Sequence, residues 1–444
     1  MKSLLNVVDK YKSLILETER YLWEHPETGY KEWKTSEYMA ENFIRLGYEI
    51  VQAEGITGFY TLIDTGRKGS EVLILAELDA VLCPTHKNAD PKTGAVHACG
   101  HHAQCATLLG LAAALTEAKI KEKLCGKIRL CAVPAEELLE LEYRSALKKQ
   151  GKIKYFSGKC EFLSRGYFDG VDLAFMVHAS PVFSINLGSV GSVVKNITFK
   201  GVSAHAGGRP WDGKNALYAA TLGINAVNAL RETFQDSDLI RVHPIITRGG
   251  EAVNAIPDRV TMESYVRGKS FEAIKKTNQK INQALCGAAL SLGTNIEIND
   301  IHGYAPLVND PTLLDIAREA ATSAIPEQQL YDLEIFTAGS TDMGDLSCLM
   351  PVLHAYAGGS VGAEHGEDYQ IQDPESACVG NAKWQLAILF LLLEKGAERA
   401  KRIIKKYKPP FSSKEAYLAY IDGINCDCDR IQYYKNGSAK VKLD

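Results

Sequence analysis

Residues 72–79 read VLILAELD, five apolar residues in a row followed by two acids that flank a leucine. A short apolar run of this kind is typical of a strand buried on both faces of a parallel sheet. Similar runs predict further strands at residues 59–63, 128–133, 171–177 and 351–356. Helical segments separate these strands along the chain. The sequence therefore predicts an α/β fold, with a mainly parallel sheet that carries helices on both faces.

Four segments carry the features of helices. Residues 3–24 place apolar side chains at helical spacing, and Pro26 and Gly29 then end the helix. The other predicted helices in this part of the fold cover residues 35–46, 105–118 and 381–395.

The stretch from about 190 to 303 has a different order of elements. Its pattern predicts strands at 192–199, 240–247, 259–266 and 294–301 and helices at 214–234 and 271–292. This is the β-α-β-β-α-β order of a ferredoxin-like α+β domain. We therefore predict a catalytic domain in two parts, residues 1–189 and 304–444, with a smaller domain of residues 190–303 inserted between them. The Lys-rich tail from about residue 405 receives no assignment.

Composition excludes several classes of protein. The 444 residues carry a net charge of −4, which gives no bulk attraction for nucleic acid. The longest apolar run, Leu386–Leu393, is far shorter than the roughly 20 residues that span a bilayer. The N-terminus becomes charged too early for a signal-peptide core. Eleven scattered cysteines favour reduced thiols, so we expect a cytoplasmic protein. From the charge and the apolar runs we expect neither a nucleic-acid partner nor a membrane partner.

Metal-binding and acidic residues gather at the ends of the predicted strands. In open α/β sheets the ligand site lies beyond the carboxyl ends of the strands. At that edge the chain supplies Glu77 and Asp79, the segment HACGHH at 97–102, Glu136 and Glu137, His178, and Glu364 and His365. Because these residues come from separate segments, their convergence predicts a functional site at one edge of the sheet.

Thiolate, imidazole and carboxylate side chains together suit a zinc-like divalent ion. One ion with an open position for water, or two ions about 3.5–4 Å apart that share the water, is the expected arrangement of a catalytic site. A structural zinc site is the alternative, and it requires four compact protein ligands with no open position. The predicted ligands are Cys99, His101, Glu137, His178 and His365.

Glu136 gains a role from its neighbour. If Glu137 holds metal, Glu136 points at the bound water and can accept its proton. In the inserted segment, His205, Asn254 and Arg267 are donors suited to an oxyanion and a substrate carboxylate. The alternative for these three is a hairpin with ordinary polar surface residues.

Six motifs support a resemblance to a known family. The chain resembles the aminoacylase/carboxypeptidase-type metallopeptidases, in the branch of hippuricase, indoleacetyl-amino-acid hydrolase and aminobenzoyl-glutamate hydrolase. The resemblance spans roughly residues 10–395. The motifs are HPETGY at 25–30, HACGH at 97–101, PAEE at 134–137, SAHA at 203–206, NAIPD at 254–258 and GSTD at 339–342.

The resemblance implies the same five metal ligands, one or two zinc or manganese ions, and Glu136 as the general base. It implies that Asp79 orients a ligand histidine from behind the metal. It also implies that His205 reaches the active site from the smaller domain, a lid that forms the interface of a homodimer. Asn254 and Arg267 would then hold the substrate.

Three positions depart from the family pattern. His102 stands where the family has Asp or Asn, and Gln104 replaces a second histidine. Thr341 stands where many relatives have Glu. His102 is therefore a candidate for an extra ligand, and the number of metal ions stays open.

The predicted function is a metal-dependent amidohydrolase that cleaves a small molecule. Its substrate is an N-acyl amino acid, an aminobenzoyl-glutamate-like compound or a dipeptide with a free carboxylate. One alternative is a non-catalytic binding protein on the same scaffold, with His102 marking a decayed site. Another is a doubly wound oxidoreductase, which the absence of Gly-x-Gly-x-x-Gly after the early strands disfavours.

Overall fold

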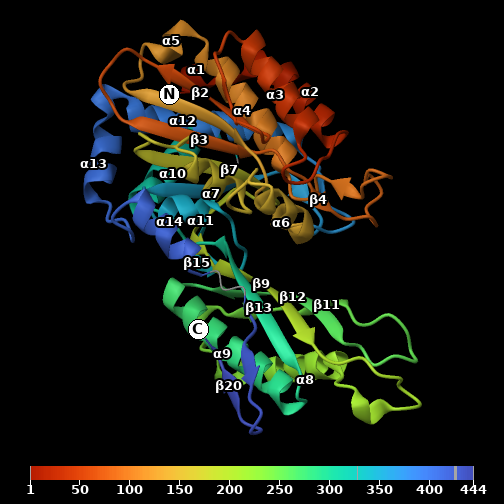
Figure 1. Ribbon diagram of the computed structural model, residues 1–444. Coiled ribbons are helices and arrows are strands. Elements are labelled where there is room, and N and C mark those ends of the chain that lie inside the picture. The colour runs from red at the N-terminus through yellow and green to blue at the C-terminus, as the bar shows by residue number, and fades with distance from the viewer. Residues whose placement is uncertain (1, 328, 425–427, 444) are drawn as a thin grey trace. The chain divides into compact units, whose positions relative to one another are not determined.

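The structure is a computed structural model that describes residues 2–327, 329–424 and 428–443, and it divides into two compact units (Figure 1). The first unit contains Met1–Gly188, Val308–Ile335 and Thr341–Lys414. The second contains Ser189–Leu307, Phe336–Ser340 and Glu415–Asp444. The described residues of the unassigned tail from Glu415 onward thus lie in the second unit, whereas the predicted boundaries placed the tail with residues 304–444.

The first unit is built on one large sheet whose central strands are parallel. Strand β3 pairs in parallel with β6 and β7, and β7 pairs in parallel with β16. Antiparallel strands lie toward both edges. This confirms the predicted α/β class. In spatial order the strands are β1 (Val51–Gln52), β2 (Phe59–Asp64), β6 (Lys127–Val133), β3 (Glu71–Glu77), β7 (Leu173–Ser180), β16 (Val352–Gly358), β8 (Ser184–Ser189) and β14 (Leu307–Val308), with β15 (Tyr331–Thr337) also beside β8.

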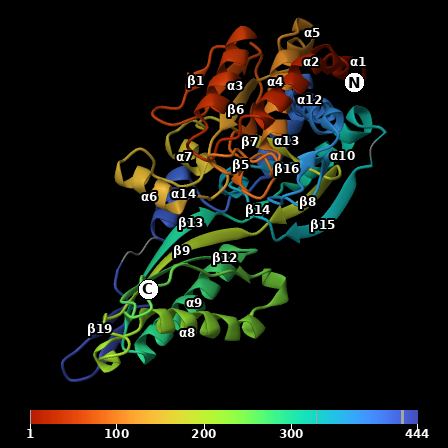
Figure 2. The same ribbon diagram turned by 90° about the vertical axis from the view of Figure 1, so that its right-hand side faces the viewer.

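Helices of the first unit cover the sheet on both faces (Figures 1 and 2). Val72, Ile74 and Ala76 of β3 pack into the main core with α4 and α12. Side chains alternate along a strand, so Glu77 points to the opposite face, where α7 meets it. The helices are α1 (Lys2–Leu5), α2 (Lys12–Trp23), α3 (Trp33–Arg45), α4 (His101–Leu115), α5 (Ala118–Lys121), α6 (Leu141–Lys149), α7 (Gly158–Ser164), α10 (Pro311–Ala324), α11 (Met343–Ser347), α12 (Asn381–Leu393) and α13 (Glu398–Lys406).

The predicted continuous helix over residues 3–24 is wrong at its start. The chain forms α1, then a 3₁₀ turn at Val8–Tyr11, and only then α2. Leu5, Val7 and Val8 are all at most 2% exposed. Three inward positions among four consecutive residues do not fit one straight helical face, so the chain tightens there.

One stretch of the described residues, Glu375–Leu393, is long and apolar enough to cross a membrane by length and composition. It combines a π-helical turn, η5 (Glu375–Gly380), with α12. Because 83% of this stretch is buried inside the protein, we interpret it as a core helix.

The second unit has the predicted β-α-β-β-α-β order. Its antiparallel strands lie in the order β10-β12-β9-β13, with β11 also beside β12, and α8 and α9 pack on the sheet (Figure 1). The predicted strand at 240–247 is split at Pro244, which lacks the N–H that a continuous ladder needs. The elements are β9 (Gly191–Lys200), α8 (Ala216–Ala229), β10 (Arg241–Val242), β11 (Ile245–Arg248), β12 (Arg259–Gly268), α9 (Phe271–Ser291) and β13 (Asn295–Tyr304), followed in the tail by α14 (Lys414–Asp422), β19 (Ile431–Tyr433) and β20 (Ala439–Val441).

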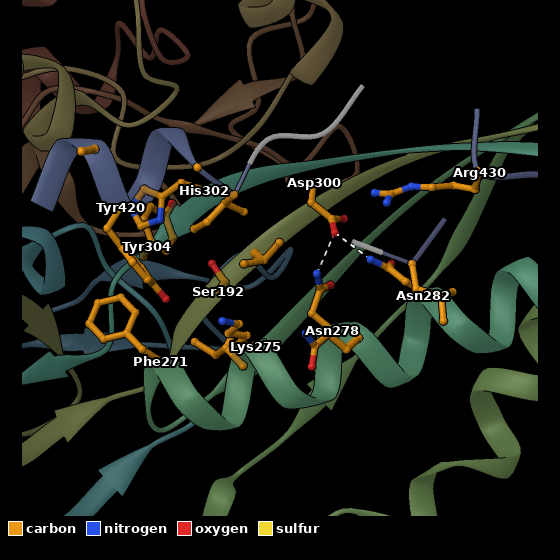
Figure 3. A pocket seen from close by; sticks show the side chains of 17 residues that line it. Ser192, Phe271, Lys275, Asn278, Asn282, Asp300, His302, Tyr304, Tyr420 and Arg430 are labelled. Carbon is orange, nitrogen blue, oxygen red and sulfur yellow. Dashed lines mark hydrogen bonds between the residues drawn. The ribbon is translucent and has the colours of Figure 1, made fainter. Parts of the chain in front are cut away.

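A cavity of about 560 Å³ lies in this unit, beside α9, β13 and the tail (Figure 3). Asp300 of β13 accepts hydrogen bonds from Asn278 and Asn282 of α9 at its wall. Behind this wall the ammonium of Lys195, which is fully buried, lies within hydrogen-bond distance of the same carboxylate and of both amide oxygens. The buried carboxylate of Asp300 therefore has a cation of the same unit beside it.

Candidate metal centre and active site

The carboxyl ends of the parallel strands bring the predicted ligands together within the first unit. Cys99 lies in the turn before α4, and His101 is the first residue of that helix. Glu137 follows β6, and His178 lies near the end of β7. His365 lies in the loop between β17 (Ser360–Val361) and β18 (Gln370–Ile371).

The predicted ligands form one contiguous cluster in space. Three sets of side chains share members, and in each set the candidate ligand atoms lie within 4.8 Å of one another. The structure therefore brings all five predicted ligands and the predicted general base to one place. The sets are Cys99, His101 and His178; Cys99, Glu137 and His365; and His101, Glu136 and Glu137.

The ring contacts orient two of the histidines toward the cluster. His178 donates from Nδ1 to the carbonyl oxygen of Ala179 at 2.7 Å, and its Nε2 lies 3.5 Å from the sulfur of Cys99. His365 places Nε2 2.8 Å from Oε1 of Glu137. Each histidine thus turns its Nε2 toward another candidate ligand.

The His101 ring gives the clearest test of whether the cluster fits a metal. Its Nδ1 lies 2.9 Å from the backbone oxygen of Asp79 and 3.1 Å from Oδ1 of the same residue. Its Nε2 is buried and has no hydrogen-bond partner in the described part of the chain, although Glu77 lies 3.2 Å away. A buried imidazole nitrogen without a hydrogen-bond partner costs free energy, and coordination to a metal ion would give it a partner. The donor set fits a zinc-like ion.

The two glutamates after β6 have pKa values shifted in opposite directions. Burial raises the pKa of Glu137, but the hydrogen bond from His365 and the nearby histidines outweigh it and bring the pKa to about 2. The pKa of Glu136 is raised well above its usual range, mainly by burial and then by the charge of Glu77. Glu137 is therefore the better permanent anion of the pair, and Glu136 the better proton acceptor.

Burial, followed by the charge of Glu137, also raises the pKa of the Cys99 thiol. A coordinating dication reverses this effect, because it holds a bound thiol in its ionised form. If Cys99 holds a metal, ionisation of its thiol would be coupled to metal binding, which would release a proton.

Backbone strain marks two of the loops that carry the cluster. Ala135, directly before Glu136, has a φ of 53°, and His365 has a φ of 62°. Residues other than glycine rarely adopt such values, and they persist only where surrounding contacts impose them. The backbone N–H of Ala135 donates to Oε1 of buried Glu32 at 2.8 Å, which fixes the first of these turns.

Sequence reasoning missed the buried residues that contact the cluster from outside. The ammonium of Lys159 on α7 lies 2.5 Å from Oε1 of Glu77 and 2.5 Å from Oδ1 of Asp342. Gln104 donates to the other oxygen of Glu77 at 2.9 Å. The sequence carried one signal for this layer, Glu77 at a strand end, but a single lysine in an otherwise unremarkable helix carried none.

His102 points away from the predicted ligands. Its Nε2 lies 3.3 Å from Glu19 of α2, and its ring lies 5.1 Å from that of Trp23. His102 belongs to none of the metal-capable groups found among the described residues. Its position gives no support to a role as an extra ligand.

His205 and Asn254 are neighbours in the second unit. Nδ1 of exposed His205 accepts hydrogen bonds from the backbone of Gly207 and Gly208 at 3.1 and 2.9 Å. In the neutral ring the proton is therefore on Nε2, which is left as a donor. The backbone N–H of Ala206 donates to the carbonyl oxygen of Asn254 at 2.9 Å, so the two loops lie side by side.

Arg267 lies at the other end of the same unit. Residues 254–258 lead into the start of β12, and Arg267 is the next-to-last residue of that strand. At about 3.3 Å per residue, the eight steps from Arg259 to Arg267 span about 26 Å. The guanidinium stacks on Tyr265 and donates to the carbonyl oxygen of Ala338 at 3.3 Å. Within one chain Arg267 and the His205–Asn254 pair are therefore far apart.

The sequence profile of Peptidase family M20/M25/M40 matches residues 73–388, well over half of the chain. The chain belongs to this peptidase family. Membership confirms the recognised family and the predicted class, a metal-dependent hydrolase of amide bonds. The matched range includes all the clustered residues and parts of both units.

Similar proteins of known name carry amide-hydrolase activities. The chain is 29% identical to the Xaa-Arg dipeptidase of Mus musculus over 311 residues, which cover 68% of this chain and 65% of the mouse protein. The match thus spans slightly less than two thirds of that relative. The chain is also 25% identical to the indole-3-acetyl-aspartic acid hydrolase of Enterobacter agglomerans, over 73% of this chain and 82% of that relative.

Solved structures agree on the fold. A dinuclear metal binding peptidase from the M20 family of Bacillus subtilis superposes with a TM-score of 0.64 at 22% identity, over 87% of this chain and 99% of its own. The aminobenzoyl-glutamate utilization protein of Klebsiella pneumoniae superposes with a TM-score of 0.65 at 20% identity, over 87% and 97%.

Proposed function

We propose that this member of the M20/M25/M40 family hydrolyses the amide bond of a small substrate with a free carboxylate. The substrate class is an N-acyl amino acid, an aminobenzoyl-glutamate-like compound or a dipeptide. The supporting observation is the cluster of Cys99, His101, Glu137, His178 and His365 with Glu136 at its side. The names of the relatives, which include dipeptidases and an acyl-amino-acid hydrolase, favour the same class.

The five clustered residues are the proposed holders of one or two divalent ions. Thiolate and imidazole favour zinc, and the carboxylate also suits manganese. When bound, such an ion polarises the scissile carbonyl and lowers the pKa of water toward about 7. Asp79 fixes the ring of His101 by accepting from its Nδ1, so that Nε2 faces the cluster.

Glu136 is the proposed general base. Its raised pKa suits a group that accepts a proton from the attacking water and returns it to the departing amine. His205 is the proposed donor to the oxyanion through its Nε2 proton. Asn254 and Arg267 are the proposed partners of the substrate, with the guanidinium pairing to its free carboxylate.

We also propose a homodimer through the second unit, and the positions of these donors support it. One chain separates His205 and Asn254 from Arg267 by the length of β12. If all three act on one substrate, two copies must contribute to each site. The exposed apolar side chains of Tyr218 and Leu222 on α8 and of Ile245 and Ile246 on β11 offer a surface for that association.

The decisive experiment joins elemental analysis of the purified protein to release of free amine from a panel of N-acyl amino acids and dipeptides. We expect one or two equivalents of zinc or manganese and metal-dependent turnover of at least one compound class. Bound metal without turnover of any compound would favour the non-catalytic alternative. Absence of metal at the cluster would overturn the proposal altogether.

The shared site makes a prediction that needs two variants of the same protein. His205→Ala and Arg267→Ala should each lose about 10²–10³ in kcat/KM. Mixed chains that carry one change each regain a site with both groups intact, so co-expressed heterodimers should recover up to half of the activity. Two inactive homodimers that yield inactive mixtures would contradict the shared site. Exposed Lys408→Ala, mixed in the same way, is the control.

A further inference from the structure

The side chain of Lys159 lies among three carboxylates next to the proposed metal centre. It is completely buried, and its ammonium is 2.5 Å from both Glu77 and Asp342. The third acid is Glu136, whose charge also acts on the ammonium. Oxygen atoms of Glu77, Glu136 and Asp342 lie within 4.8 Å of one another, a spacing that suits a bound cation. The ammonium is the cation that the fold supplies there.

Two contacts fix the lysine to Asp342. The backbone N–H of Lys159 donates to Oδ2 at 2.9 Å, while the ammonium donates to Oδ1. Both oxygens of this buried carboxylate are therefore bound by one residue. Asp342 directly precedes α11, so this pairing also ties α7 to the segment that follows the GSTD motif.

The charges of this site support a lysine that stays protonated. Burial alone lowers the pKa of Lys159, but Asp342 and Glu77 outweigh it and the pKa is raised. Buried carboxylates without such a partner are costly, because the interior does not replace their hydration.

Glu77 connects this site to the metal ligands. One of its oxygens binds Lys159, and the other accepts from Gln104 at 2.9 Å and lies 3.2 Å from Nε2 of His101. Among the described residues, that nitrogen of His101 has no hydrogen-bond partner. Lys159 and Gln104 together hold the Glu77 carboxylate beside the metal-facing edge of His101.

We propose that Lys159 is the permanent cation of a three-carboxylate site formed by Glu77, Glu136 and Asp342. It occupies a place that would otherwise take an additional divalent ion, and it acts as a positioning residue that fixes Glu77 beside His101. The inference rests on the proposed metal centre. The metal content of the unaltered protein tests that centre, whereas the difference between variants tests Lys159.

The first test counts metal ions. After equilibrium dialysis against Mn²⁺, Lys159→Ala should hold one more ion per chain than the unaltered protein, because the truncated side chain vacates the three-carboxylate site. Adding Glu77→Gln to Lys159→Ala should remove the additional ion. Exposed Lys152→Met is the matched control and should leave the count unchanged. An equal count in Lys159→Ala and the unaltered protein overturns the resident-cation assignment.

The second test removes one charge of each sign, which limits the loss of stability. Lys159→Met combined with Asp342→Asn removes one charge of each sign and leaves Glu77 without its anchor. We expect cooperative unfolding as in the unaltered protein, a fall in kcat of about 10–100-fold with KM within about twofold, and a changed visible spectrum of the Co²⁺-loaded protein. An unchanged kcat and an unchanged Co²⁺ spectrum would overturn the positioning role.

Discussion

Among the residues whose burial is described, each of the two units buries one lysine against a carboxylate, and the two settings differ in what else surrounds the pair. Lys159 of the first unit and Lys195 of the second are both fully buried. Lys159 meets three carboxylates beside thiol and imidazole groups. Lys195 meets one carboxylate, Asp300, and the amide oxygens of Asn278 and Asn282.

The two sites differ in the net charge that remains after the lysine is paired with its carboxylates. In the second unit Asp300 pairs with Lys195, and the amides of Asn278 and Asn282 contact both charged groups. The positive charge of buried Arg430 also acts on Lys195, so no negative charge is left in excess there. Such a closed pair serves the fold. In the first unit the acids outnumber the ammonium, and further negative charge from Glu137 lies close by. Acids in excess of the protein's own cations indicate a place for an external one.

The largest effect expected from this comparison is on Glu136. Glu136→Gln removes the proton acceptor but keeps the shape of the side chain, so kcat should fall by about 10²–10⁴. The metal content should stay that of the unaltered protein. Glu137→Gln is the matched control, because it removes a proposed ligand and should lose metal. Loss of metal from Glu136→Gln instead would show that the two glutamates have the opposite roles.

A smaller effect is expected at Lys195, and it concerns stability instead of activity. Lys195→Met leaves Asp300 buried without its cation, which should destabilise the second unit by about 3 kcal/mol. Hydrogen exchange of the amides of β9 and β13 should accelerate accordingly. Lys200→Met on the same strand removes a half-exposed lysine paired with Glu297 and Asp429, and it should cost at most about 1 kcal/mol.

The metal content distinguishes the role of Lys195 from that of Lys159. The metal content of Lys195→Met should equal that of the unaltered protein, whereas the Lys159 variants are expected to change it. If Lys195→Met altered the metal count or left amide exchange unchanged, the closed pair would not be merely structural and the contrast between the units would fail.

The sequence predicted those parts of the site that rest on local pattern. An apolar run that ends in acids identifies a buried strand and its functional edge. The segment HACGHH precedes the helix predicted at 105–118, which in the structure already begins at His101. The parallel sheet then brings Glu137, His178 and His365 to that edge from distant segments. Strand periodicity and topology rules were sufficient for this step.

The rest depends on three-dimensional contacts without a local signature. Lys159 is 82 positions from Glu77 and 183 positions from Asp342 in the sequence, and no pattern in its own segment predicts either contact. The direction of His102 toward Glu19 was equally hidden, because it depends on how α2 packs against α4. The split of residues 3–24 followed from tertiary burial that overrides helical spacing.

The smallest effect lies within the closed pair itself. Asn278 donates to Asp300 at 2.7 Å and accepts from Lys195 at 2.8 Å, but Asn282 contacts the same two groups. Asn278→Ala therefore leaves neither charge without a partner, and we expect a loss of only about 1 kcal/mol, measured by hydrogen exchange in β13. Gln279→Ala, an exposed neighbour on α9, is the control and should stay within about 0.5 kcal/mol of the unaltered protein. A loss for Asn278→Ala as large as that for Lys195→Met would mean that the amides, and not the ion pair, carry the stability of this buried group.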